Sequence, residues 1–416
     1  MADILFLAHR IPFPPDRGDK IRSFHELKAL AGLGRVHLAC FADDEDDAAN
    51  LAGLRAAIGP ALGEAHVEIR RTSRAAAGAR ALAEGRPVSL VLFDSASLRG
   101  FVSDQLASGR IGTVFAFSGQ MGQFVPAGTA ARFVMDFGDV DSAKFEAYGG
   151  EGGLMAPVHR REGRLLAAFE REVAGRADVS LFVSEAEAAL FRARSGLPGA
   201  DVRALQNGVD LDYYDPDAPR RRPGPSSNEE GAGEAGPRPS PGNLIVFTGQ
   251  MDYAPNIDAV RWFAGEVMPL LPRARFAIVG RKPAEAVRRL AGPRVIVTGS
   301  VPDVRSWLAA ADVVAAPLRI ARGVQNKVLE AMAMARPVVA SPAAFEGIEA
   351  EPGRHLIVAD GAEAQAEAIA ALLGDPERGR ALGRAARARM VEAYRWEARL
   401  EPLARLVGLA PRRAAA

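Results

Sequence analysis

The chain has little cysteine, little lysine and no long apolar run. Its 416 residues include one cysteine, Cys40, which excludes an intramolecular disulfide and a multi-cysteine zinc site. The six histidines show no H-x-x-x-H spacing, which also argues against zinc. No apolar run approaches the ~18–20 residues that span a bilayer, and the stretch 4–8 is too short for a signal peptide. We therefore expect a cytoplasmic protein.

The charge balance excludes a nucleic-acid partner at the level of the whole chain. Lysine and arginine number 52 against 51 aspartates and glutamates, which gives a net charge of +1 and no basic footprint. Only five of the 52 basic residues are lysines, namely Lys20, Lys28, Lys144, Lys282 and Lys327. Because arginine serves almost everywhere else, a lysine within a motif indicates a need for a compact ammonium group.

Short apolar runs alternate with helical patterns in both halves of the chain. The expected strands are 3–8, 36–41, 67–69, 113–117, 132–136 and 179–183 in the first half, and 244–247, 274–279, 295–298, 313–315, 337–340 and 356–358 in the second. Strands separated by helices predict doubly wound parallel sheets. Between the halves, 217–243 holds six prolines, five glycines and no large apolar residue, which predicts a disordered insertion.

The fold class expected from this alternation is α/β, with two Rossmann-like domains facing across a cleft. The domains are 1–206, an acceptor-side domain; 207–243, an interdomain segment containing the insertion; 244–390, a donor-binding domain; and 391–416, a C-terminal helix that crosses back toward the first domain. Ligands of such sheets bind beyond the carboxyl ends of the strands.

The densest polar motif follows strand 313–315. A loop with Arg319, Arg322 and Gly323 leads into a helix, whose free N–H groups and dipole suit a phosphate. Lys327 lies one turn into this helix and adds a positive charge. Glu330 shares its face and can accept hydrogen bonds from neighbouring sugar hydroxyls. The alternative interpretation is an ordinary surface Lys–Glu pair.

The run Lys327-Val-Leu-Glu-Ala-Met-Ala, followed by Arg-Pro-Val-Val, resembles the donor-site helix of glycosyltransferase family 4, whose members are retaining enzymes of the GT-B fold. The resemblance implies that Lys327 contacts the donor diphosphate and Glu330 the nucleotide ribose. The first glutamate of the family's E-x7-E motif would fall at position 322, where this chain has Arg322. The donor sugar is therefore left open.

Further segments of the second half fit the same resemblance. The segment 207–214 looks like the family's interdomain segment, although Asn-Gly at its start is also a plain turn. The loop 247–256 resembles the glycine loop that faces the donor phosphates, but it lacks the family's basic residues. The segments 279–281 and 299–303 resemble the base pocket, with a solvated loop arginine as the alternative for Arg281. The predicted donor-binding residues are Gly249, Arg281, Val301, Arg319, Arg322, Gly323, Asn326, Lys327 and Glu330.

The N-terminal segment 5–25 looks like the sugar transferases associated with exosortase (PEP-CTERM) and exopolysaccharide systems, as do 136–144 and 319–327. The resemblance implies that the Gly18 loop approaches the donor diphosphate. Arg17 and Lys20 are then expected to bind acceptor or phosphate, with a solvated basic turn as the alternative. Asp19 contacts the acceptor or, equally, caps a helix.

Four aspartate and lysine positions complete the expected site. Asp136 ends a strand and should face the cleft, and Asp139, Asp141 and Lys144 follow on the acceptor side. Asp139 and Asp141 form an Asp-x-Asp pair, which also occurs elsewhere in this chain and is a weak metal signal. We expect no metal and no cofactor. The predicted catalytic set is Gly18, Asp136, Lys327 and Glu330.

The expected function is retaining transfer of a sugar from a nucleotide-diphosphate sugar to a polysaccharide or lipid-linked acceptor, in exopolysaccharide biosynthesis. The arginine-rich segment 377–413, in which Arg380, Arg384 and Arg387 share a helical face, suggests either peripheral docking on anionic lipid at the inner face of the plasma membrane or a plain solvated helix. Two other functions stay open. A nucleotide-sugar epimerase would use Asp136 and Asp139 and need no acceptor. A non-catalytic regulator would bind donor without turnover.

Overall fold

The chain folds into two compact α/β units in the computed structural model. The structure describes residues 2–150, 152–217, 243–321 and 323–409. Unit 1 comprises Met1–Gln206 with Arg399–Ala416, and unit 2 comprises Asn207–Ala398. The predicted insertion 217–243 lies outside the described residues except at its two ends, and Arg322 also lies outside them.

Unit 1 is built on a seven-stranded parallel sheet. Its strands are β1 (Asp3–Ala8), β2 (Val36–Ala42), β3 (Leu62–Ile69), β4 (Ile111–Phe117), β5 (Arg132–Gly138), β6 (Val179–Phe182) and β7 (Val202–Ala204). They lie in the order β3-β2-β1-β4-β5-β6-β7. The central strand β1 is fully buried from Ile4 to Ala8, which explains its unbroken apolar run. The strand order reverses between β1 and β4, so the loops after these strands flank the crevice where ligands of such sheets bind.

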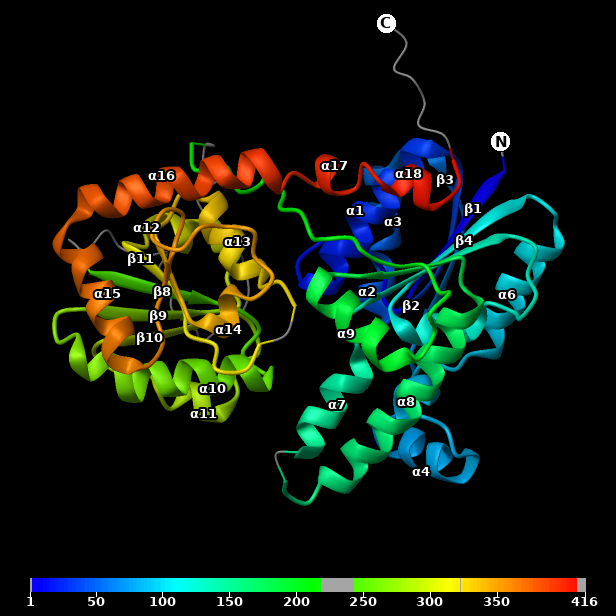
Figure 1. The fold of residues 1–416 in the computed structure, drawn as a ribbon, viewed down its shortest axis with the longest axis horizontal. Helices are drawn as coiled ribbons and strands as arrows, with labels where there is room; N and C mark the ends of the chain where they lie inside the picture. The colour runs from blue at the N-terminus through cyan, green and yellow to red at the C-terminus, as the bar shows by residue number, and fades with distance from the viewer. Residues whose placement is uncertain (1, 151, 218–242, 322, 410–416) are drawn as a thin grey trace, which may run out of the picture. The chain divides into compact units, whose positions relative to one another are not determined.

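Helices cover both faces of this sheet (Figure 1). They are α1 (Gly18–Leu33), α2 (Glu45–Ala49), α3 (Leu51–Ile58), α4 (Arg74–Glu84), α5 (Val88–Leu92), α6 (Ala96–Ala107), α7 (Asp141–Gly150), α8 (Ala156–Arg176), α9 (Glu185–Ser195) and α18 (Leu403–Leu406). Helices α7 and α8 pair along their lengths and project from the sheet as a hairpin. Near the C-terminus α18 packs against α1, and Thr113 donates a hydrogen bond to the Val407 carbonyl.

Unit 2 holds a six-stranded parallel sheet in the order β10-β9-β8-β11-β12-β13. Its strands are β8 (Leu244–Thr248), β9 (Arg275–Val279), β10 (Val295–Gly299), β11 (Val313–Ala316), β12 (Val338–Ala340) and β13 (Ile357–Val358). The order reverses between β8 and β11. The loops after these two strands therefore flank the crevice of unit 2.

The helices of unit 2 sandwich this sheet. They are α10 (Ala254–Trp262), α11 (Glu285–Arg288), α12 (Val304–Ala310), α13 (Asn326–Ala333), α14 (Pro342–Phe345), α15 (Ala362–Gly374), α16 (Pro376–Ala393) and α17 (Trp396–Arg399). In Figure 1, α10 and α11 lie on one side of the strands and α12 and α13 on the other. A single hydrophobic core contains the apolar residues of β8, β9, β11 and α13.

The predicted fold class, two parallel-sheet α/β domains, is confirmed. Two local expectations were wrong. Strand β7, which has only three residues, was not expected. The segment 391–416 was expected to be one helix, but its described residues hold the end of α16 followed by α17 and α18, and Pro402 cannot continue a helix that began before it.

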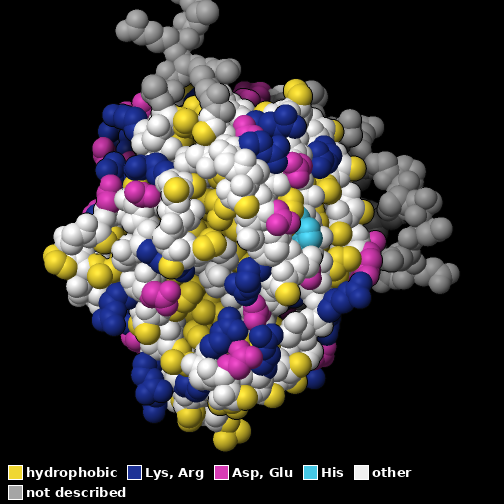
Figure 2. All heavy atoms as spheres, turned by 90° about the vertical axis from the view of Figure 1, so that its right-hand side faces the viewer, with side chains coloured by type: hydrophobic (Ala, Val, Ile, Leu, Met, Phe, Trp, Pro, Cys, Tyr) yellow, Lys and Arg dark blue, Asp and Glu magenta, His cyan; other side chains and the backbone are white. Residues whose placement is uncertain are grey.

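The arginine-rich face expected on α16 is only partly free. Arg387 donates hydrogen bonds to the carbonyl oxygens of Leu211 (3.1 Å) and Tyr214 (3.0 Å). Its guanidinium is therefore bound to backbone groups of unit 2. Arg380 pairs with Glu377. Figure 2 shows a face of unit 1 rather than α16, and on that face basic and acidic side chains are intermixed. Across the described ranges, no helix is long and apolar enough to cross a bilayer.

Candidate functional site

The turns after β8 and β9 approach each other closely beside the crevice of unit 2. The Gly249 N–H donates a hydrogen bond to the Val279 carbonyl at 3.0 Å. A Cβ on Gly280 would lie 1.6 Å from the Gly249 carbonyl oxygen, so only glycine fits at that position. A Cβ on Gly249 would in turn lie 2.8 Å from the Asn256 amide nitrogen and 3.4 Å from the Lys327 ammonium. The predicted loop residue Gly249 and helix residue Lys327 are therefore neighbours.

Lys327 is held by neutral groups. Its ammonium donates a hydrogen bond to Asn256 Oδ1 at 2.6 Å and lies 4.5 Å from the centre of the Phe247 ring. Burial lowers the pKa of Lys327 to about 7, against the opposing effect of Glu330. No ion pair joins Lys327 to Glu330 within the part of the chain that the structure describes, so the surface Lys–Glu pair considered above does not form.

Glu330 has a different partner, the hydroxyl group of Tyr214. Tyr214 is 9% exposed and packs edge-on against Tyr213, with ring centres 4.9 Å apart. Burial raises the pKa of Glu330, while the Tyr214 hydrogen bond and the nearby Lys327 charge act in the opposite direction. A carboxylate oriented by a buried hydroxyl keeps further lone pairs for a ligand.

The nearest neighbours of this pair escaped sequence reasoning. Asn256 and Phe247 are 5% and 0% exposed, and with Tyr214 they hold the two predicted residues. The sequence signal that could have found Asn256 is an amide in the first turn of a helix directly after the glycine loop. Tyr214 carries no such signal, because a buried tyrosine is ordinary core material.

The remaining predicted donor residues are less tightly grouped. Asn326 begins α13 and accepts a hydrogen bond from Asn207 at 3.2 Å. Arg319 is exposed and pairs with Asp258 of α10, so in this structure it serves a surface ion pair. Arg281, Val301 and Gly323 lie in the loops after β9, β10 and β11, all at the carboxyl edge of the sheet.

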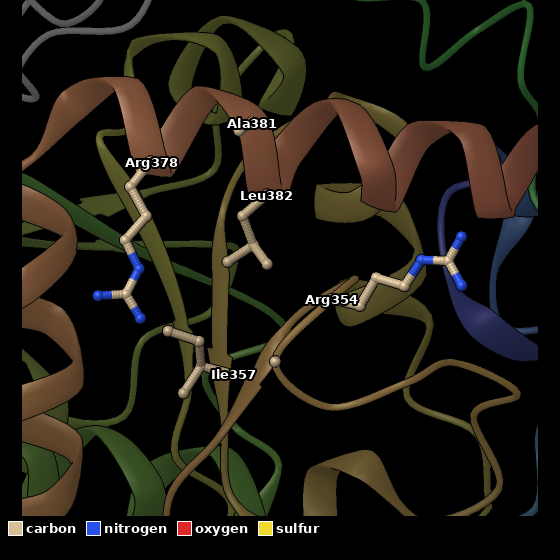
Figure 3. Close-up of a pocket in the computed structure, with 6 residues that line it drawn as sticks. Arg354, Ile357, Arg378, Ala381 and Leu382 are labelled. Carbon is tan, nitrogen blue, oxygen red and sulfur yellow. The ribbon is translucent and has the colours of Figure 1, made fainter.

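A separate hollow of about 230 Å³ lies between β13 and α16 (Figure 3). In the figure the guanidinium of Arg378 points toward Ile357, and the side chain of Arg354 points away from them. Arg354 pairs with Glu351 at 3.1 Å. None of the residues that line this hollow belongs to the predicted site, and we assign it no ligand.

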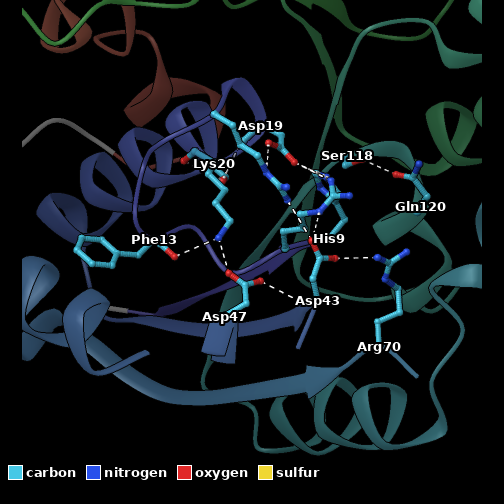
Figure 4. A network of polar contacts seen from close by, with 12 residues as sticks. His9, Phe13, Asp19, Lys20, Asp43, Asp47, Arg70, Ser118 and Gln120 are labelled. Carbon is cyan, nitrogen blue, oxygen red and sulfur yellow. Dashed lines mark hydrogen bonds and ion pairs between the residues drawn. The ribbon is translucent and has the colours of Figure 1, made fainter. Parts of the chain in front are cut away.

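In unit 1 the loop after β1 and the start of α1 form a network of compensated charges (Figure 4). Asp19 lies 2.7 Å from Arg10, 3.0 Å from Arg17 and 3.2 Å from His9. Burial alone would raise the pKa of Asp19, but His9, Arg10 and Arg17 hold it well below its usual range. Asp19 is not the helix cap, because α1 begins at Gly18 and Arg17 occupies the capping position.

Lys20, predicted to bind acceptor or phosphate, is engaged by groups of unit 1 in this structure. Lys20 is 5% exposed, and its ammonium donates hydrogen bonds to Asp47 at 2.5 Å and to the Phe13 carbonyl at 3.3 Å. These contacts tie α1 to α2 and to the loop after β1. The ammonium therefore stabilises the fold rather than facing an acceptor.

Asp136, predicted to be catalytic, lies in the interior of unit 1 in this structure. Asp136 is fully buried, and its Oδ2 accepts hydrogen bonds from Arg22 Nε (2.9 Å) and Nη2 (2.6 Å). Its other oxygen accepts the Gly138 N–H at 2.8 Å. Glu26, also fully buried, lies 3.0 Å from Arg22 Nε. Both carboxylate oxygens of Asp136 are therefore engaged by groups of unit 1 in this structure.

Asp139, Asp141 and Lys144 follow β5 and begin α7. Burial, then the charges of Glu187 and Asp141, raises the pKa of Asp139 to about 7, while Lys144 acts against the shift. Burial also raises the pKa of Asp141, again against Lys144. In the described ranges, no group of three or more His, Cys, Asp or Glu side chains is arranged to hold a metal ion.

Comparison with known protein families assigns the two units. Residues 22–208 match a family described as glycosyl transferase 4-like domain, and residues 242–375 match a family described as glycosyl transferases group 1. Each unit therefore contains a domain of a glycosyltransferase family, and the two doubly wound sheets have the GT-B fold of similar solved structures.

The similar proteins differ in what they act on. A GDP-mannose-dependent alpha-(1-6)-phosphatidylinositol monomannoside mannosyltransferase of Mycolicibacterium smegmatis is 30% identical over 253 residues, which are 57% of this chain and 64% of that enzyme. Sucrose-phosphate synthase of Thermosynechococcus elongatus has a TM-score of 0.68 at 18% identity and 98% coverage of both chains. Anabaena HepE, solved with UDP and glucose, has a TM-score of 0.64 at 16% identity, covering 98% of this chain and all of that one. The two solved structures support the fold alone.

Proposed function

We propose that the chain transfers a sugar from a nucleotide-diphosphate sugar to a polysaccharide or lipid-linked acceptor. The observation that carries the proposal is the Lys327 ammonium, whose contacts are neutral and which adjoins Gly249 at the crevice between β8 and β11. A positive charge beside a glycine turn and a helix N-terminus fits a diphosphate. Glu330, one turn along α13, then accepts hydrogen bonds from the ribose.

The chemistry assigned to these residues is charge stabilisation. As the bond between sugar and diphosphate breaks, negative charge grows on the leaving phosphate. Lys327 and the N–H groups of the first turn of α13 stabilise that charge in a position where water is partly excluded. The retaining outcome, the exopolysaccharide pathway and peripheral attachment at the inner face of the plasma membrane belong to this proposal through the family resemblance.

The relatives indicate which donors to test first. The mycobacterial relative depends on GDP-mannose, and HepE was solved with UDP and with UDP-glucose. We therefore choose UDP, GDP, UDP-glucose and GDP-mannose as probes.

A thermal-shift screen with these four compounds tests the donor site. A ligand at 100 times its Kd stabilises the folded state by about 2.7 kcal/mol. We expect at least one probe to raise the Tm of the parent, and Lys327→Ala and Glu330→Ala to lose most of that shift. Arg261→Ala, an exposed change on α10, is the control and should respond like the parent. If no probe stabilises the parent, or all variants respond alike, the donor site is wrongly assigned.

The reaction itself is tested with the donor that binds. We expect release of nucleoside diphosphate to require an added glycan or lipid-linked saccharide. Isomerisation of the donor sugar without any acceptor would instead identify an epimerase. Binding without turnover over a broad acceptor panel would identify a regulator.

A further inference from the structure

The loop that follows β8 contains no basic residue of its own. Between Gly249 and Ile257 the chain reads Gly-Gln-Met-Asp-Tyr-Ala-Pro-Asn-Ile, and its one charge is the negative Asp252. A diphosphate at this turn would find backbone N–H groups there but no cation. A cation beside Gly249 comes from another element, because Lys327 is carried by α13, which follows the neighbouring strand β11.

Asn256 fixes where that cation lies. Its amide Nδ2 donates to the Gln250 carbonyl oxygen at 2.9 Å, and its Oδ1 accepts from Lys327 at 2.6 Å. The first contact sets the orientation of the amide, because a rotated amide would place its NH₂ group against the ammonium and its oxygen against the carbonyl. Asn256 is 5% exposed and is therefore held in this orientation by its surroundings.

Phe247 completes the support. Phe247 is the penultimate residue of β8, just before the glycine loop. The centre of its ring lies 4.5 Å from the Lys327 ammonium. An aromatic face attracts a cation without neutralising it. Both supports are neutral, so neither cancels the charge of a protonated Lys327 toward an anion beside Gly249.

We propose that Asn256 is a positioning residue that holds the Lys327 ammonium over the Gly249 turn. A cation carried by α13 then binds a phosphate that lies against the glycine loop after β8. The ligand recognised is the terminal phosphate of a nucleoside diphosphate. This inference rests on the proposed function, because it concerns the same donor site.

The test compares diphosphate with monophosphate binding by isothermal titration calorimetry. The probes are UDP and UMP, or GDP and GMP, whichever pair binds the parent. Asn256→Ala removes the acceptor that holds Lys327, and we expect it to weaken diphosphate binding about tenfold with little change for the monophosphate. Asn256→Asp keeps the shape but adds a carboxylate that pairs with Lys327, and we expect a larger loss confined again to the diphosphate.

A control variant and a fluorescence measurement show whether the Asn256 variants are folded. Arg261→Ala lies on the exposed side of α10 and should bind both nucleotides like the parent. Trp262 in α10 reports by its fluorescence whether the helix is intact. Equal weakening of diphosphate and monophosphate in the Asn256 variants, or no weakening of either, would overturn the positioning role while leaving the donor site in place. Failure of the parent to bind any of the four nucleotides would remove both proposals.

Discussion

The buried charges around Asp136 offer a sharp test of which residues hold the fold and which act on a substrate. Arg22 is 3% exposed, and Asp136 and Glu26 are fully buried. Burial, then the negative charge of Asp136, raises the pKa of Glu26 well above its usual range despite the nearby Arg22. Burial and the neighbouring Asp136 therefore favour the protonated form of Glu26.

Two isosteric changes should have very different costs. Asp136→Asn removes the principal counter-charge of the buried Arg22 guanidinium, and breaking such a pair typically costs about 3–5 kcal/mol, less what Glu26 recovers by ionising beside Arg22. For a unit of this size that lowers Tm by roughly 6–20 °C. Glu26→Gln keeps the shape and a donor toward Asp136, so it should change the free energy of unfolding by less than about 1 kcal/mol at pH 5.

The pH dependence follows from the raised pKa of Glu26. The folded state keeps a proton that the unfolded chain loses above about pH 4.5. The stability contributed by the protonated form is therefore complete below that pH and is lost as the pH rises toward the folded-state pKa. Glu26→Gln lacks this loss, so its stability relative to the parent should increase with pH by up to about 1.4 kcal/mol per unit.

Urea unfolding from pH 5 to 8 measures these effects, and the sequence supplies an internal control. All three tryptophans, Trp262, Trp307 and Trp396, belong to unit 2, so fluorescence follows that unit while far-ultraviolet circular dichroism follows both. Asp136→Asn should shift only the transition seen by circular dichroism. Equal destabilisation by Asp136→Asn and Glu26→Gln, or an Asp136→Asn variant of parental stability that has lost turnover, would refute the structural role.

Three further predictions concern unit 2. Because burial lowers the Lys327 pKa to about 7, nucleoside diphosphate affinity should be lower at pH 8 than at pH 7. Lys327→Arg should remove that loss, because arginine stays charged. Equal affinities of the parent at both pH values in calorimetry would contradict this. Tyr214→Phe should raise the pKa of Glu330 further and weaken a ribonucleotide about tenfold while sparing its 2′,3′-dideoxy analogue; equal losses would contradict it. Gly280→Ala should lower Tm and diphosphate affinity together, because its Cβ would overlap the Gly249 carbonyl; a fully stable variant would show that the two turns can separate.

Much of the fold could be predicted because its signals are local. The strand β1 is a continuous apolar run between a polar start and a polar loop, and its bounds match the expected 3–8. In the same way, a helix after a strand and a glycine loop is visible without knowing the rest of the chain. What the sequence could not show is pairing at long range. Arg22 meets Asp136 across 114 positions, and nothing near Asp136 indicates that a guanidinium will cover it.

The candidate site was predictable to the same extent. Lys327 and Glu330 belong to one contiguous motif, so the resemblance could indicate both. Their partners lie on other segments: Asn256 is 71 positions from Lys327, and Tyr214 belongs to the segment that precedes the insertion. Such partners are set by the sheet topology, which brings the loops after β8 and β11 to one edge.

The lysines of the two units differ in the groups that surround their ammonium charges. Of the three lysines found within motifs, Lys20 is buried against the carboxylate of Asp47, and Lys144 lies in the field of Asp139 and Asp141. Lys327 instead contacts two neutral groups, the Asn256 amide and the Phe247 ring. A compensated buried charge stabilises the fold, whereas a partly desolvated charge held by neutral partners gains most when an anion arrives. That difference is the physical reason for locating donor binding at Lys327 rather than at the charged start of α1.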